Sequence, residues 1–136
     1  MLRKILCAAT VCLLPSVGFS SPQVIATWNC VMNSPVATLQ GVFQLNPDGT
    51  LLTEGEVILV GTNGSYRYPR IPGVWRLHPD QFGRGLQIVE MRFIPPGKTP
   101  LAIYPAVQQN PNYLYDLVPS SAVPGYNVET SCQRIG

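Results

Sequence analysis

Few residues in this chain have the types and the spacing that catalysis requires. His78 is the only histidine among the 136 residues, and the Gly-x-Ser-x-Gly turn of serine hydrolases is absent. Because His78 stands beside Pro79, a turn explains it without any chemistry. Glu54 and Glu56 would project from one side of a strand, whereas glycoside cleavage needs carboxylates that flank the bond. We therefore predict no catalytic residue; a hydrolase would require two of these side chains, or one of them and Asp80, to converge in a cleft.

Residues 66–76 carry side chains suited to binding. Residues 66–98 hold six basic and two acidic side chains, whereas residues 21–65 hold three acidic side chains and no basic one. Arg, Tyr and Trp supply much of the binding energy at protein interfaces, and guanidinium groups bind anions. The alternative is that the basic sector pairs internally with the acidic hairpin. The residues that we predict to bind a partner are Tyr66, Arg67, Tyr68, Arg70, Trp75 and Arg76.

The segment 95–112 is a second candidate for binding because it is long and rich in proline. It holds five prolines and one short apolar piece at 101–104. Long loops on a rigid scaffold often carry binding residues, although ordinary loop packing also uses tyrosine. The tyrosines around this segment are Tyr104, Tyr113, Tyr115 and Tyr126.

Residues 1–20 have the pattern of a cleaved secretory signal peptide. Arg3 and Lys4 precede an uncharged, mostly apolar stretch, and Gly18 and Ser20 supply the small residues for a cut after Ser20. The apolar stretch of about fifteen residues is shorter than the roughly twenty that span a bilayer. We therefore expect a periplasmic or secreted protein with no stable membrane span after cleavage.

Cleavage after residue 20 changes both the charge and the cysteine count. Two of nine basic residues leave with the leader, so seven bases face seven acids and no nucleic-acid partner is expected. Two of the four cysteines also leave, and Cys30 and Cys132 remain as an even pair in an oxidising compartment. We predict a disulfide between them. With both sulfurs engaged, only His78 is left as a transition-metal ligand, so neither a metal nor a cofactor is expected.

Strand patterns recur through residues 21–136, and helical patterns are nearly absent. Trp28 and Cys30 would share one face of the first strand because strand side chains alternate. Pro47 and Gly49 form a turn that makes 36–60 the clearest hairpin. The predicted strands are 24–32, 36–45, 50–60, 66–68, 73–78, 86–94, 113–118 and 126–134.

Proline, glycine and charged residues qualify these predicted strands. Pro69 and Pro72 are expected to interrupt the chain between 66–68 and 73–78. Gly55 suggests a bulge or bend. In 86–94, Val89, Met91 and Phe93 form the predicted core face, with Glu90 and Arg92 pointing outward.

These patterns predict an all-β fold in one domain, residues 21–136. Six to eight short antiparallel strands fit a small β-barrel closed by one disulfide, with a β-sandwich as the alternative. The barrel is favoured because a bridge from the first strand to the last requires neighbouring ends, and because closure removes exposed strand edges.

Several short motifs resemble those of small exported lipocalin-like (calycin-type) barrels. They are Trp-Asn-Cys at 28–30, Asp-Gly-Thr at 48–50, Gly-Val-Trp at 73–75 and Cys-Gln-Arg at 132–134. This resemblance implies a carrier that holds a small apolar or amphipathic ligand inside the barrel. The disulfide framework is also similar to that of periplasmic C-type lysozyme inhibitors, which implies an enzyme inhibitor.

The leading functional hypothesis is an exported, non-enzymatic protein that binds a protein partner at the cell envelope or outside the cell. The contacts are expected from segments 66–76 and 95–113, with Arg67, Arg70 and Trp75 as the main anchors. A lipocalin-like carrier, a periplasmic enzyme inhibitor and a hydrolase are the alternatives.

Overall fold

The computed structural model describes residues 23–61 and 64–136, and these residues form nine β-strands. The predicted leader, 1–20, lies outside the described residues. Within those ranges, no helix is both long enough and apolar enough to cross a membrane. The strands are β2 (Thr27–Asn33), β3 (Ala37–Leu45), β4 (Thr50–Leu59), β5 (Ser65–Pro79), β6 (Gln87–Phe93), β7 (Leu101–Ile103), β8 (Ala106–Val107), β9 (Tyr113–Pro119) and β10 (Asn127–Arg134).

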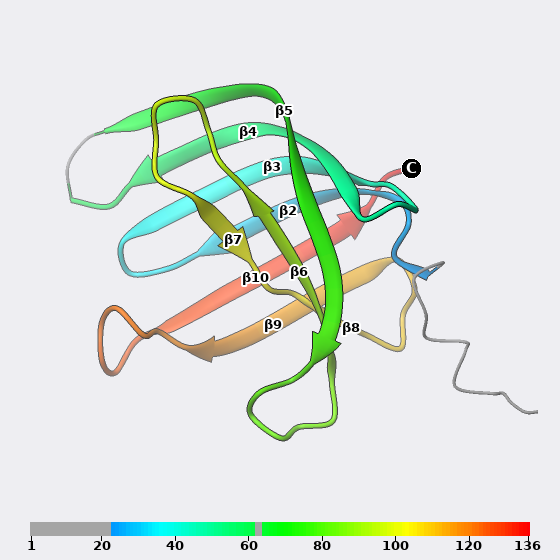
Figure 1. Cartoon of the computed structure of the whole chain (residues 1–136). Helices are drawn as coiled ribbons and strands as arrows, with labels where there is room; N and C mark the ends of the chain where they lie inside the picture. The colour runs from blue at the N-terminus through cyan, green and yellow to red at the C-terminus, as the bar shows by residue number, and fades with distance from the viewer. Residues whose placement is uncertain (1–22, 62–63) are drawn as a thin grey trace, which may run out of the picture.

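The strands form a closed antiparallel barrel. Neighbours follow the order β5–β4–β3–β2–β10–β9–β8–β6, and pairing of β5 with β6 closes the ring, while β7 pairs with β6 outside it. In Figure 1, β6 and β7 lie in front of β2, β3 and β4, and β5 curves from one layer to the other. The all-β barrel prediction is therefore confirmed, and the sandwich alternative is not.

The disulfide joins the first and last strands of the described chain, as predicted. Cys132 of β10 lies directly opposite Cys30 of β2, with their Cα atoms 4.0 Å apart and 102 residues between them in sequence. Both cysteines are fully buried. Beside them, the Thr27 N–H donates to the Gly136 carbonyl over 3.1 Å, so β2 and the chain end after β10 stay in register.

Strand β5 is continuous, which corrects the predicted interruption at Pro69 and Pro72. Its first part pairs with β4 only, Gly73 and Val74 pair with both β4 and β6, and the residues from Trp75 onward pair with β6 only. Proline lacks an N–H donor but is tolerated where a strand has a free side or a bulge. The register between β4 and β5 shifts between Thr53 and Gly55, close to Pro69, so the bulge expected at Gly55 is confirmed. The fifteen-residue strand accommodates both prolines in this way.

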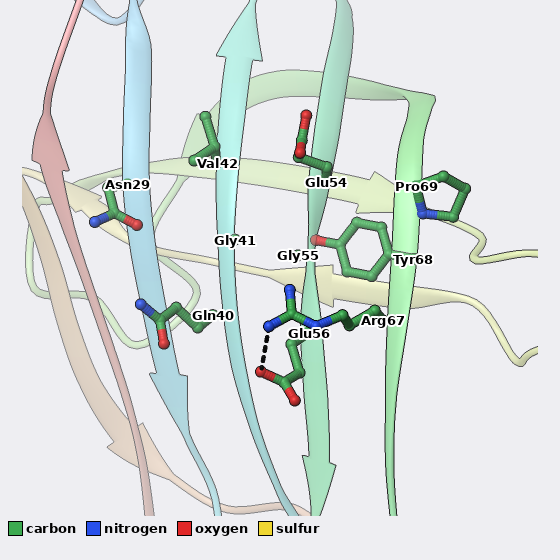
Figure 2. Close-up of a pocket in the computed structure, with 10 residues that line it drawn as sticks. All are labelled: Asn29, Gln40, Gly41, Val42, Glu54, Gly55, Glu56, Arg67, Tyr68 and Pro69. Carbon is green, nitrogen blue, oxygen red and sulfur yellow. Dashed lines mark ion pairs between the residues drawn. The ribbon is translucent and has the colours of Figure 1, made fainter.

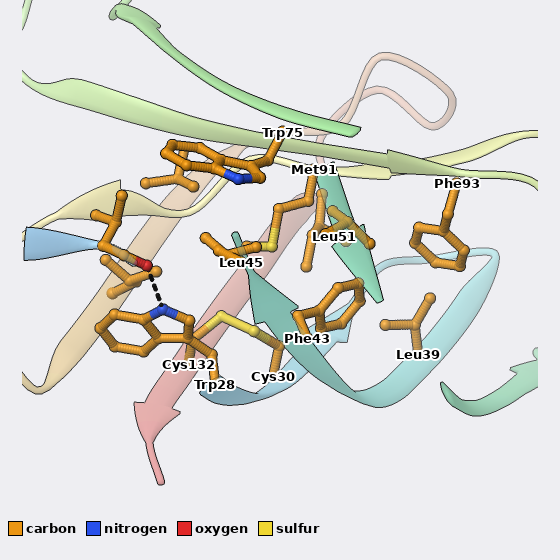
Figure 3. Packing of buried hydrophobic residues seen from close by; sticks show 14 of the residues in the cluster. Trp28, Cys30, Leu39, Phe43, Leu45, Leu51, Trp75, Met91, Phe93 and Cys132 are labelled. Carbon is orange, nitrogen blue, oxygen red and sulfur yellow. Dashed lines mark hydrogen bonds between the residues drawn. A yellow bond between two sulfur atoms is a disulfide. The ribbon is translucent and has the colours of Figure 1, made fainter. Parts of the chain in front are cut away.

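Large apolar side chains fill the barrel interior. Trp28 and Phe43 are fully buried, and the Trp28 indole donates to the Val24 carbonyl over 3.0 Å. Phe43 packs edge-to-face against Phe93 with ring centroids 5.5 Å apart. Figure 3 shows these rings around the disulfide, together with the side chains that close the centre of the barrel. The other fully buried core residues include Leu39, Leu45, Leu51, Val89 and Met91.

The ring is joined least extensively between β6 and β9. Strand β8 has two residues and bridges the gap through Ala106, which lies opposite Ile88 on one side and Tyr115 on the other. Strand β7 pairs with β6 alone, and β9 beyond Tyr115 pairs with β10 alone. The barrel wall therefore has an open seam between β7 and the end of β9.

Candidate binding grooves

The predicted basic residues at the start of β5 lie on the outer surface. The Arg67 guanidinium is 3.9 Å from the Glu56 carboxylate, and the Arg67 side chain is 81% exposed. Arg70 donates to the Gln44 side chain over 3.0 Å. Tyr66 is partly buried, and the Lys98 ammonium lies over its ring, 4.6 Å from the centroid. Arg67 and Glu56 form the one ion pair between the basic sector and the acidic hairpin among the described residues.

Two of the predicted binding residues belong instead to the core, which corrects their assignment as surface anchors. Trp75 is 7% exposed, and its indole donates to the Asn46 carbonyl over 2.8 Å. Tyr68 is 3% exposed, packs against Phe93, and shares a 2.9 Å hydrogen bond with the Thr53 hydroxyl. Burial raises the pKa of Tyr68 to about 12. Aromatic side chains serve cores and interfaces equally well, so composition does not separate these roles.

A first groove lies over β3, β4 and β5, where two glycines face each other. Gly41 and Gly55 are directly opposed, and Tyr68 fills the inward space that their missing side chains leave. Figure 2 shows the Tyr68 hydroxyl directed at this glycine pair, with Arg67 reaching over Glu56. We call this depression the glycine groove. Its lining residues are Asn29, Gln40, Gly41, Val42, Glu54, Gly55, Glu56, Arg67, Tyr68 and Pro69.

Two of the carboxylates considered for catalysis line the glycine groove. Glu54 and Glu56 both line it from β4, as their spacing predicts, and therefore sit side by side rather than across a cleft. Arg67 pairs with Glu56. Among residues 23–61 and 64–136, no group of three or more His, Cys, Asp or Glu side chains is arranged to hold a metal ion. The groove therefore offers polar contacts and two neighbouring carboxylates.

A second groove opens at the seam between β7 and β9. Arg76 from β5 and Tyr104, which follows β7, both line it. In this groove the structure brings Arg76 together with segment 95–113, which Tyr66 meets outside the groove at Lys98. We call this the seam groove. Its lining residues include Met32, Arg76, His78, Asp80, Ile88, Glu90, Arg92, Ala102, Ile103, Tyr104, Asp116, Val118, Val128 and Thr130.

A buried carboxylate organises the charged end of the seam groove. The Glu90 side chain is only 6% exposed, and Arg76 donates to its Oε1 over 3.3 Å. Arg92 donates to Oε2, and the His78 Nε2 atom lies 3.1 Å from Oε1. Burial by itself would raise the pKa of Glu90, but the hydrogen bonds and charges of Arg92 and Arg76 outweigh burial and lower it. Glu90 therefore remains ionised and holds two arginines at the surface.

The loop between β5 and β6 is tied across the groove to β9. Arg84 donates to both Asp116 oxygens, over 2.7 and 2.9 Å, and to both Asp80 oxygens, over 2.8 and 2.9 Å. Hydrogen bonds from Arg84 hold the pKa of Asp80 well below its usual range, and those from the two carboxylates raise the pKa of Arg84. These bidentate pairs position the loop.

His78 and Asp80 both line the seam groove, but their partners are different. Asp80 is engaged by Arg84, whereas His78 faces Glu90 and its Nδ1 donates to the Pro79 carbonyl over 3.0 Å. In the described part of the chain, no serine, threonine or cysteine is hydrogen-bonded to His78.

The sequence reasoning missed Glu90 and Asp116 as site residues. Glu90 was expected to point outward from its strand, and it does, but Arg76 lies directly opposite it and covers it. This contact could have been predicted if the strands 73–78 and 86–94 had been paired. Arg76 and Glu90 would then be cross-strand neighbours, and neighbours of opposite charge attract. Asp116 gave no comparable signal, since its partner Arg84 is 32 residues away in a loop.

Comparison with known proteins gives no relative: no protein-family model, no curated protein and no solved structure matches this chain.

Proposed function

We propose that this chain is an exported, non-enzymatic binding protein that engages a protein partner through the seam groove. The observation that carries the proposal is the meeting of Arg76 from β5 with Ala102 and Tyr104 in one groove. The groove is lined by a charged cluster around Glu90 and by apolar side chains that include Val118 and Val128. Protein interfaces combine such an apolar centre with a polar rim.

The filled centre of the barrel supports binding at the seam groove rather than in a central cavity. Trp28, Phe43, Met91 and their neighbours occupy the centre, and each is fully buried by protein atoms. Barrels of about eight strands hold either their own side chains or one small ligand. A lipocalin-like carrier would need these side chains to move aside, so the packing weighs against that alternative.

Exposed apolar side chains next to the groove support a protein partner. Val74 is 55% exposed and lies directly opposite Arg92 in the β5–β6 ladder, and Tyr104 is 42% exposed. Arginine and tyrosine beside an aliphatic residue are typical of interface anchors. An enzyme inhibitor is one form that this function could take, in which case the partner is an enzyme of the same compartment.

Site-specific photo-cross-linking in the native envelope fraction tests the proposal. A photoreactive phenylalanine analogue at Tyr104 should capture one partner, and the same analogue at Tyr113, outside the groove, is the matched control. Arg76→Gln with Arg92→Gln should reduce capture from Tyr104, whereas Arg67→Gln with Arg70→Gln should not. Equal capture from Tyr113, or none from Tyr104, would contradict a partner at the seam groove.

A further inference from the structure

Two strand edges face the seam groove without a strand between them. Strand β7 pairs with β6 only, and the last part of β9 pairs with β10 only. The Val89 N–H donates to the Pro105 carbonyl over 2.8 Å, so the backbone carbonyl of Pro105 points toward β6. Backbone groups alternate in direction along an antiparallel strand, so those of Ala102 and Tyr104 face away from β6, toward the groove.

The edge of β9 is already blocked. The Leu117 N–H donates to the Asp116 carboxylate over 2.9 Å, and Arg84 holds that carboxylate in place. A charged side chain folded onto its own strand edge is a common protection against unwanted pairing. Among the described residues, nothing equivalent is bonded to the outward groups of Ala102 or Tyr104. The strand edge that remains available for pairing is therefore that of β7.

The residues beside this edge define what a further strand should carry. Val74, Arg92 and Ala102 lie in one row on the outer face, and Ala102 is small enough for the Arg92 guanidinium to reach across it. Arg92 is 55% exposed. An acidic side chain opposite Ala102 would meet that guanidinium.

Its neighbours in the added strand would point to the other face of the sheet, because strand side chains alternate. There the groove offers the partly buried apolar side chains of Met32, Val118 and Val128. A segment that alternates apolar and acidic residues matches both faces of the site.

We propose that the free edge of β7 binds an extended segment of the partner protein by strand addition, with an acidic residue of that segment paired to Arg92. Main-chain hydrogen bonds to Ala102 and Tyr104 supply the binding, and the alternating side chains supply the selectivity. This inference rests on the proposed function and specifies how the seam groove recognises its partner.

Titration of the intact, oxidised protein with a defined peptide tests the inference. The probe is acetyl-Val-Thr-Val-Glu-Val-Thr-Val-amide, followed by backbone amide NMR. We expect the amides of Ala102 and Tyr104 to shift and to exchange more slowly with solvent. Two N-methylated analogues, each with the donors of one edge removed, distinguish strand addition from side-chain docking. A strand that pairs by one edge should lose binding at least about tenfold with one analogue and keep it with the other.

Two substitutions test the predicted charge pair. Arg92→Gln should weaken the peptide several-fold, and Arg67→Gln, which changes a more exposed arginine outside the seam groove, should not. Absence of binding, shifts confined to β3 and β4, or equal binding of both N-methylated analogues would overturn strand addition. If Tyr104 still cross-links a partner under those outcomes, the proposed function stands and only this mode of recognition fails.

Discussion

Gly41→Ala is the perturbation that most directly tests the packing around Tyr68. A Cβ atom at Gly41 would lie 2.7 Å from the Tyr68 hydroxyl oxygen and 3.0 Å from the Glu54 carbonyl oxygen. A Cβ atom at Gly55 would lie 2.3 Å from the Gln40 carbonyl oxygen, which is backbone. The first clash can be relieved by removing a hydroxyl group, and the second cannot.

The structure sets the expected size of these effects. Overpacking a core site costs about 1–3 kcal/mol, so Gly41→Ala should lower the free energy of unfolding within that range. Tyr68→Phe removes the hydrogen bond to Thr53, which is buried, and should itself cost about 1–2 kcal/mol. In the double variant the clash with the hydroxyl is gone. Gly41→Ala should therefore cost about 1 kcal/mol less in the Tyr68→Phe background than in the natural sequence.

Urea unfolding followed by tryptophan fluorescence measures this coupling, because Trp28 and Trp75 are both buried. The set comprises the natural protein, the two single variants and the double variant. Gly55→Ala with and without Tyr68→Phe is the matched control. A Cβ atom at Gly55 would also lie 2.9 Å from the Tyr68 hydroxyl oxygen, but its closer contacts are with backbone atoms, so its cost should fall less than that of Gly41→Ala. The packing argument is refuted if Gly41→Ala costs the same in both backgrounds within about 0.5 kcal/mol, or if Gly55→Ala is rescued equally.

Three further predictions follow from the fold. Replacing Cys30 and Cys132 with alanine should lower the free energy of unfolding by about 4–5 kcal/mol, because the bridge closes a loop of about a hundred residues; a loss below about 1 kcal/mol in denaturant unfolding would contradict this. The pKa of Glu90 is lower in the folded protein than in the unfolded chain, so ionised Glu90 stabilises the fold at neutral pH. This contribution is lost as the pH falls and the carboxylate is protonated. The Glu90→Gln variant should therefore lose less stability than the natural protein between about pH 5 and pH 3. Because the pKa of Tyr68 is raised to about 12, the unfolded state releases that proton first and stability falls above about pH 10. Tyr68→Phe should show a shallower fall in alkaline urea titrations, and parallel curves would count against the raised pKa.

Much of the barrel could be predicted from local patterns. The alternation around Trp28 and Cys30 and the turn at Pro47 and Gly49 gave the first three strands, and the cysteine pair correctly placed the ends side by side. These features depend on side-chain period and turn chemistry, which act over a few residues. The prediction that the sheet closes into a barrel also depended on the disulfide, which requires the first and last strands to be neighbours.

The continuity of β5 could not be predicted from its own sequence. Pro69 and Pro72 normally argue against a strand interior, and only the absence of a second neighbour along the first half of β5 makes them acceptable. That absence is a property of the assembled sheet. The two-residue strand β8 was likewise too short to leave a periodic signal.

Only some of the residues that line the seam groove were predicted. The segment around Arg76 was identified from its charge and aromatic content, but the same criterion also selected Tyr68 and Trp75, which are core residues. Whether an aromatic residue faces inward depends on strand register, and the bulge near Pro69 alters that register within the segment. Arg67 and Arg70 are exposed, yet neither lines the seam groove. The paired glutamine variants test whether these two arginines contribute to binding, and a partner at the seam groove requires that they do not.

The position of the disulfide also has a mechanical consequence. Cys30 and Cys132 lie close to the two ends of the described chain, with 102 positions of sequence separation between them. A pulling force applied to those ends would pass from β2 to β10 through the covalent bond and would leave the intervening strands unloaded. In a single-molecule stretching experiment, the oxidised barrel should extend by only the short flanking segments, whereas the reduced protein should release the length of the enclosed loop.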